Sequence, residues 1–157
     1  MSLIANVFFG APGIGATHET IESEVTWGEP IVNGSFIVPS VIAASAVDSG
    51  NTPTTLIRPG MLMGNISGTK EWLPWDDAAT DGSEVLKGVL LYSVGTQQFG
   101  AGVQRYLGAI LISGQVKASK LLKAGNANYG IDGDVDEAAI RAAMALRRFE
   151  LDDAIYQ

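Results

Sequence analysis

The sequence predicts a mostly β protein of the α+β class, with one helix near its C-terminus and a long extended N-terminal arm. Three observations carry this prediction. Short apolar runs alternate with turn residues between residues 55 and 92, a capped amphipathic pattern covers residues 135–148, and glycine, proline and period-two alternation characterise the first 53 residues. At 157 residues, the chain has the length of one domain with an arm.

Residues 55–92 have the pattern of strands separated by turns and by an acidic loop. Pro59 and Gly60 supply turn chemistry, because proline fixes φ and glycine accepts a positive φ. The expected elements that follow are an apolar run at residues 61–63, a turn at 65–68, a strand at 71–75, a polar loop at 76–82 and an apolar strand at 87–94.

The C-terminal third is predicted to contain two further strands and the helix. Residues 103–112 and 149–155 are strand-like, and Ser113-Gly114 predicts a hairpin-like turn between residues 110–112 and Val116. Asp134 is expected to cap a helix from Val135 to about Arg148, and Glu137 to complete a capping box. The helix face expected to pack on a sheet consists of Val135, Ala139, Ala142, Ala143 and Leu146, with Ile140 and Met144 widening it.

Residues 1–53 are predicted to be an extended arm, and residues 54–157 a core domain. A loop at residues 48–53 marks the boundary, and Pro39 confines any strand at residues 32–42 to an edge or a bulge. The apolar residues at the start of the arm have two interpretations. They fold back on their own core, or they dock on a partner, for example by adding a strand to the edge of its sheet.

Composition excludes several classes of function. The net charge of −7, with 17 acidic and 10 basic residues, argues against binding to nucleic acids or to an anionic membrane. The chain has no cysteine, which excludes disulfides, and residues 3–9 are too short and lack the positive flank for a signal peptide or a membrane span. The mean hydropathy of +0.20 indicates either a large core or apolar surface that another subunit covers.

No pattern in the sequence predicts an enzyme, a metal site or a cofactor. His18 is the only histidine, so neither a catalytic triad nor a His/Cys metal site can be assembled. The alternating Asp132, Asp134 and Asp136 do not match an EF-hand loop, and residues 95–102 lack the features of a phosphate-binding loop. Lys117, Lys120 and Lys123 form a basic cluster, which is either a solvated face or a contact for acidic neighbours.

One ordered set of residues resembles the head decoration proteins of lambda-type tailed phages. The set is Leu56, Gly60, Met61, Trp75, Asp81, Gly82, Gly88, Val89 and Leu90. The spacing of Asp81-Gly82 to the Gly88-Val89-Leu90 segment is its most specific part, and the resemblance covers roughly residues 55–155. It implies a compact β-rich core, similar to a small barrel or sandwich, with a C-terminal helix.

The resemblance also implies a function. Such a structural virion protein binds the outer capsid surface as a homotrimer and stabilises the expanded head by clamping adjacent capsomers. Its partner is the major capsid protein, and neither nucleic acid nor membrane is involved. In lambda-type decoration proteins the N-terminal segment contacts the capsid, so the expected capsid-binding residues are Leu3, Ile4, Val7, Phe8, Phe9, Val25 and Trp27.

Two other functions remain open on the sequence alone. The first is a β-rich carbohydrate- or cell-surface-binding module, in which Trp72, Trp75 and Tyr92 form a sugar-stacking platform, although the same residues equally suit a core. The second is a small hydrolase that uses the carboxylates between Asp76 and Glu84, for which a solvated turn is the competing interpretation.

Overall fold

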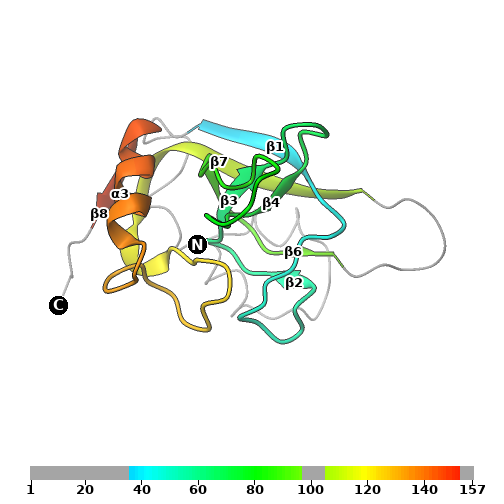
Figure 1. Ribbon diagram of the computed structural model, residues 1–157, viewed down its shortest axis with the longest axis horizontal. Helices are drawn as coiled ribbons and strands as arrows, with labels where there is room; N and C mark the ends of the chain where they lie inside the picture. Colours follow the sequence, from blue (N-terminus) through cyan, green and yellow to red (C-terminus); the bar gives the residue numbers. More distant parts are fainter. Residues whose placement is uncertain (1–35, 97–104, 153–157) are drawn as a thin grey trace, which may run out of the picture.

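The computed structural model describes residues 36–96 and 105–152 of the chain, and in this part the protein is mostly β (Figure 1). The strands are β1 (Phe36–Ile42), β2 (Leu56–Ile57), β3 (Leu62–Asn65), β4 (Trp72–Pro74), β5 (Gly88–Leu90), β6 (Val94–Gly95), β7 (Tyr106–Lys117) and β8 (Phe149–Asp152). The helical elements are the 3-10 helix η1 (Ala118–Lys120) and the α-helix α3 (Glu137–Leu146).

Five strands form a closed barrel, which confirms the predicted β-rich core with a helix near the C-terminus. The strand order is β1-β4-β3-β5-β7, and β7 pairs with β1 to close the cylinder. All contacts within the barrel are antiparallel except the single parallel pair of Ile42 and Trp72 between β1 and β4. Closure leaves β8 as the one strand that extends the sheet beyond the barrel, and it lies parallel to β7.

The long strand β7 pairs with three other strands. It pairs with β1 from Tyr106 to Ser113, with β5 at Ile110 and Leu111, and with β8 from Gly114 to Lys117. The predicted hairpin turn at Ser113-Gly114 is therefore wrong. Gly114 has a φ of 136°, which favours glycine, and here this conformation lets one strand change its neighbour without reversing the chain.

Strand β1 lies within the residues 1–53 that the sequence analysis assigned to the arm, yet it belongs to the barrel. It pairs with β7 along its whole length, and Ala43, Ala46 and Asp48 after it are buried. Pro39 lies where β1 has β7 as its only neighbour, since β4 joins only at Ile42. The core therefore includes residues from Phe36 onward, and the segment that precedes the barrel is residues 1–35.

Two hydrophobic clusters lie on the two faces of the sheet, because successive side chains of a strand point to opposite sides. Met63, Leu90 and Ile110 belong to one cluster, together with side chains from β2 and β6. Their strand neighbours Leu62, Val89 and Leu111 belong to the other cluster, which α3 and the segment after η1 cover. Each fully buried apolar side chain of this size contributes about 1.5–3 kcal/mol to stability.

The helix begins at Glu137 and ends at Leu146, so it is shorter than predicted. The two predicted capping side chains both act, but they act before the helix rather than on its first turn. Asp134 accepts a hydrogen bond from the backbone N–H of Asp136 at 3.0 Å, and Glu137 accepts one from the N–H of Gly133 at 2.8 Å. These bonds fix the turn that leads into α3.

The helix face predicted to be buried is right for Ile140, Ala143 and Met144, which lie in or against the cluster beneath α3, and wrong for its other members. Ile140 and Met144 are fully buried, whereas Val135 is 91% exposed and Leu146 is 86% exposed. Ala139 and Ala142 are exposed as well. Because Ile and Met bury more apolar area than Ala, the helix is rotated to place these two large side chains on the sheet, and the alanine-rich face points away from it.

A substitution at Gly60 tests the packing of the barrel against the segment after η1. Gly60 has a φ of +81°, and a Cβ atom there would lie 2.1 Å from the backbone oxygen of Lys120. We expect Gly60→Ala to lower the free energy of unfolding, measured by urea denaturation, by about 2 kcal/mol or more. Gly68→Ala is the matched control, because a Cβ there meets nothing within 4 Å. Equal stability of the two variants would contradict a close approach of Gly60 to the backbone of Lys120.

Candidate functional site

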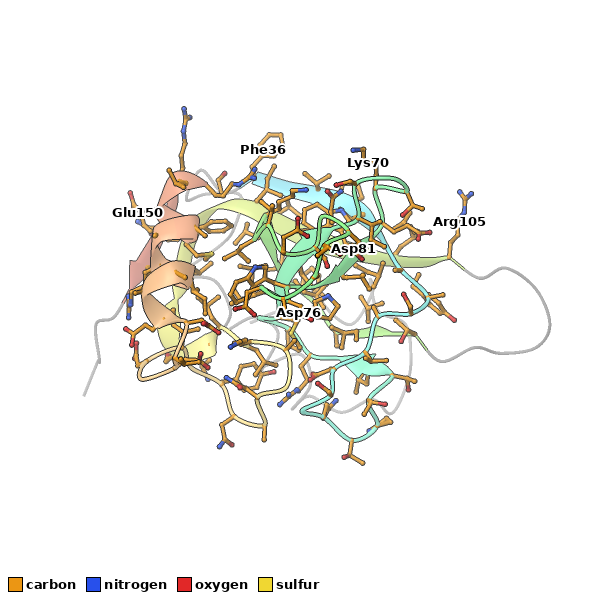
Figure 2. All side chains as sticks on the ribbon, in the orientation of Figure 1. Phe36, Lys70, Asp76, Asp81, Arg105 and Glu150 are labelled. Atoms are coloured by element: carbon orange, nitrogen blue, oxygen red, sulfur yellow. The ribbon has the colours of Figure 1, made fainter. Side chains whose placement is uncertain are left out.

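The seven predicted capsid-binding residues lie outside the described residues. Leu3, Ile4, Val7, Phe8, Phe9, Val25 and Trp27 all belong to residues 1–35, as does His18. The structure does describe the point at which residues 1–35 are joined to the barrel, and we call this point the arm root. The arm root is Phe36 at the start of β1, with a side chain that is 61% exposed (Figure 2).

The arm root lies beside the end of α3. Phe36 pairs with Ser113 of β7, and the next residue of β7, Gly114, pairs with Phe149 of β8. The N–H of Gly114 also donates a hydrogen bond to the carbonyl oxygen of Arg148 at 3.4 Å. The register of β1 shifts between Phe36 and Ile37, so regular pairing with β7 breaks at this point. The described chain therefore begins at a sheet margin, next to the basic residues after α3.

The acidic loop after β4 is a set of hydrogen-bonded turns rather than a cluster of free carboxylates. Asp81 accepts hydrogen bonds from the Oγ and the N–H of Ser83 at 2.6 and 2.9 Å. Glu84 accepts one from the N–H of Gly82, and Asp76 one from the N–H of Ala78. The bonds from Ser83 lower the pKa of the Asp81 carboxyl below its usual value. This is the local turn chemistry that the sequence indicated.

The three aromatic residues of the sugar-platform hypothesis do not form one exposed surface. Trp75 is buried in the cluster beneath α3, and its Nε1 donates a hydrogen bond to the carbonyl oxygen of Glu84 at 2.8 Å. Tyr92 packs against the same cluster, whereas Trp72 packs against the cluster on the opposite face. Stacking on a sugar needs exposed ring faces, so this arrangement does not favour a carbohydrate site at these residues.

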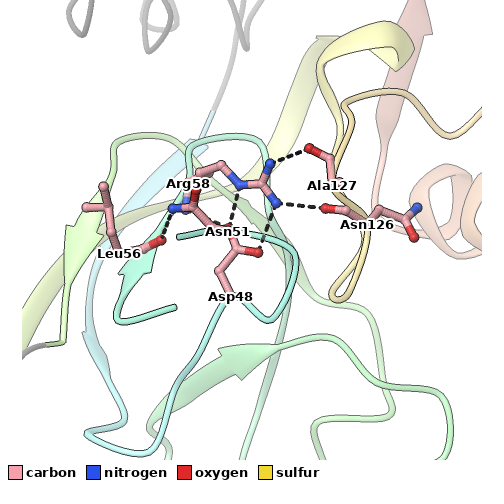
Figure 3. Close-up of polar contacts among 6 residues, drawn as sticks. All are labelled: Asp48, Asn51, Leu56, Arg58, Asn126 and Ala127. Atoms are coloured by element: carbon pink, nitrogen blue, oxygen red, sulfur yellow. Dashed lines mark hydrogen bonds and ion pairs between the residues drawn. The ribbon is translucent and has the colours of Figure 1, made fainter. Parts of the chain in front are cut away.

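An ion pair that the sequence did not predict joins the buried Asp48 to Arg58 (Figure 3). Asp48 has no exposed side-chain surface, and both of its oxygens accept hydrogen bonds from the guanidinium group, at 2.6 and 3.0 Å. Arg58 also donates to the carbonyl oxygens of Asn126 and Ala127, at 2.7 Å each. The ring of Tyr129 lies 5.7 Å from the guanidinium carbon.

This arrangement joins three segments that are far apart in the sequence: the loop after β1, the segment after β2, and the loop at residues 126–129. The hydrogen bond with Asp48 raises the pKa of Arg58 above its ordinary value. All the donors and acceptors face one another within the protein, so the geometry is that of a structural tie. The only sequence signal was that Arg58 is the first basic residue of the chain.

The basic cluster of Lys117, Lys120 and Lys123 is not a free charged face. Lys123 forms ion pairs with Asp134 and Asp136, which raise its pKa. Lys117 and Lys120 also interact with other groups of the chain. Hydrogen bonds from the N–H of Asp136 and from Asn126 lower the pKa of Asp134. The aspartates before α3 thus bind side chains and backbone of this chain.

Among residues 36–96 and 105–152, no group of three or more His, Cys, Asp or Glu side chains is placed to hold a metal ion. In the same part of the chain, no helix is long and apolar enough to cross a membrane. Comparison with known proteins gave no matching family model, and no curated protein matches the sequence.

Removal of the Arg58 guanidinium is expected to destabilise the protein strongly. Arg58→Met leaves the buried Asp48 carboxylate without its partner, and such a loss costs about 3–5 kcal/mol of unfolding free energy. Arg141→Met is the matched control, because Arg141 pairs with Glu137 and Asp132 at the surface, where ion pairs contribute little. Chemical denaturation of both variants at pH 7 tests this, and equal losses would show that Asp48 and Arg58 do not form a buried tie.

Acid is expected to destabilise the protein. Hydrogen bonds lower the folded-state pKa of Asp81, Asp134 and Glu137 below their unfolded values. The unfolded state therefore binds protons first, so stability is full above the unfolded pKa values and falls as the pH decreases below about 5.

The matched variants are Asp134→Asn and Asp77→Asn, because Asp77 is exposed and makes no hydrogen bond with the described residues. Denaturation midpoints at pH 7, 5 and 3 should show a smaller acid-induced loss for Asp134→Asn than for Asp77→Asn. Identical losses would contradict the assignment.

Proposed function

We propose that this chain is a head decoration protein of a tailed phage. In this proposal it is a structural protein and not an enzyme, and it binds the outer surface of the expanded capsid as a homotrimer. It stabilises the head by clamping adjacent capsomers through contact with the major capsid protein. The observation that carries the proposal is that the residues of the resemblance from Gly60 to Leu90 meet in one structural unit, whereas Leu56 lies outside it in β2.

That unit consists of Gly60 and Met61, the strands β3 and β4, the acidic loop and β5. Gly60, Gly82 and Gly88 each occupy positions where a Cβ atom would lie within 2.5 Å of a neighbouring atom. Trp75 and Asp81 close the acidic loop through their hydrogen bonds to Glu84 and Ser83. The motif therefore specifies a particular backbone path. The barrel with a helix near its C-terminus is also the kind of core that the resemblance implies.

The proposed mechanism is burial and strand addition, without chemistry. Residues 1–35 contain the predicted apolar docking residues, four glutamates and no lysine or arginine. They join the barrel at the arm root, where β1 has a neighbour on one side only and its pairing is irregular. An extended segment that leaves such a margin can add a strand to a sheet edge of a capsid subunit. Three arms on one trimer make the second and third contacts effectively intramolecular, so a weak single-arm affinity is sufficient.

A carbohydrate- or cell-surface-binding module is the alternative. The burial of Trp75 and the placement of Trp72 and Tyr92 on opposite faces of the sheet remove the main argument for it. Binding of the protein to a glycan array would restore this alternative.

Deletion of residues 1–20 tests the proposal. We expect a folded core, with an unchanged denaturation midpoint, that no longer co-sediments with expanded empty capsids of the phage that carries the protein. The full-length variant Phe8→Ser/Phe9→Ser should bind at least tenfold more weakly, since two buried phenyl rings are lost. His18→Ala is the control, because His18 lies in the same segment but outside the docking set. Unchanged capsid binding by the deletion variant would contradict the docking role of the arm.

A further inference from the structure

The outer face of α3 is apolar and uncovered by any residue in the described part of the chain. Its exposed members are Val135, which precedes the helix, and Ala138, Ala139, Ala142, Ala145 and Leu146. A surface helix normally presents charged and polar side chains to water. Here the charged residues Glu137 and Arg141 lie at the flank and pair with each other. The uncovered face therefore has the composition of an interface.

The two ends of this face carry opposite charge. The N-terminal end carries four acidic residues, and Lys123 and Arg141 form ion pairs with them. The four acids are Asp132, Asp134, Asp136 and Glu137. That end retains an excess of two negative charges. Arg147 and Arg148 follow the C-terminal end, are exposed, and have no ion-pair partner among the described residues. The helix thus carries an acidic end and a basic end on either side of an apolar centre.

We propose that α3 pairs with the α3 of a second copy of this chain, antiparallel, about a two-fold axis that passes near Ala139 and Ala142. This orientation places Arg147 and Arg148 of each copy beside the acidic end of the other. It also places Val135 beside the partner's Leu146 at both ends of the contact. The alanines between them allow the two helix axes to approach closely, and the two helix dipoles oppose each other favourably. The contact is isologous, so one surface is sufficient to form it.

The charges favour a second copy over the other possible occupants. A parallel pair would bring the two acidic ends together and the two basic ends together. Residues 1–35 of the same chain contain four glutamates and no base, so they match Arg147 and Arg148 but repel the acidic end. Of these three arrangements, only the antiparallel copy matches both ends and the apolar centre at once.

This contact goes beyond the proposed function, because a two-fold contact cannot close a trimer. In a decoration layer it would join subunits of neighbouring trimers and connect them across the shell. The contact is measured in solution without capsids, so it stands or falls independently of the docking proposal.

Single cysteines test the orientation, since the full-length protein has none of its own. We expect Ala142→Cys to form a disulfide-linked pair of chains under mild oxidation, seen on a denaturing gel. Val135→Cys alone should not, because its two copies would lie roughly 16 Å apart along the axis, while a disulfide needs Cα atoms within about 7 Å. An equimolar mixture of Val135→Cys and Leu146→Cys, with one variant carrying a size tag, should form the mixed pair.

The control is Ala78→Cys, an exposed alanine of the acidic loop, which sets the level of cross-linking by random collision. A second, independent variant is Ala142→Glu, which should lower the mass measured by light scattering at the same protein concentration while leaving the circular dichroism spectrum unchanged. Cross-linking of Ala142→Cys at the level of Ala78→Cys would overturn the proposal. Self-linking of Val135→Cys above that level would overturn the antiparallel orientation.

Discussion

The pairing of β7 with three partners is the constraint on which the rest of the fold depends. The first part of β7 pairs with β1 and closes the barrel, its middle pairs with β5, and its last part pairs with β8. The change of partner occurs between Ser113 and Gly114, where the strand passes from β1 to β8. Because β7 changes its pairing partner at this point, the arm root and the residues after α3 lie side by side. One strand therefore positions both the arm root at the start of β1 and the strand β8 that follows α3.

A second constraint operates at the opposite side of the molecule, in loops without regular structure. Asp48 and Arg58 form an ion pair in which Asp48 is fully buried, and Arg58 also donates hydrogen bonds to the backbone carbonyl oxygens of residues 126 and 127. A buried ion pair contributes little net stability compared with apolar packing, but the loss of one partner is costly. The tie consequently specifies one arrangement of the loops around β2 and β6 rather than supplying most of the stability of the fold.

Elements with short-range causes could be predicted from the sequence, and those with long-range causes could not. The β3–β4–β5 unit was predictable because glycine, proline and asparagine fix its turns locally. The acidic loop was predictable because aspartate side chains accept hydrogen bonds from nearby backbone N–H groups. The turn expected at Ser113-Gly114 does not form, because β7 continues through Gly114 and pairs with β8 there. The glycine alone had indicated a turn. The helix face was predicted only in part because eight of the ten residues of α3 are apolar, so the sequence pattern alone does not single out Ile140 and Met144 as the buried pair. Nothing local indicated that Asp48 and Arg58 would meet, and the predicted docking residues lie outside the described residues.

In the proposed function, the barrel is a scaffold that acts through its surfaces. The two surfaces to which we assign protein partners are the arm root and the outer face of α3, which is exposed among the described residues. The central claim is that these subunits work as trimers. Light scattering of the full-length protein over a dilution series tests it most directly: the account predicts a mass that does not fall below three chains on dilution. A mass of one chain across the series would contradict it.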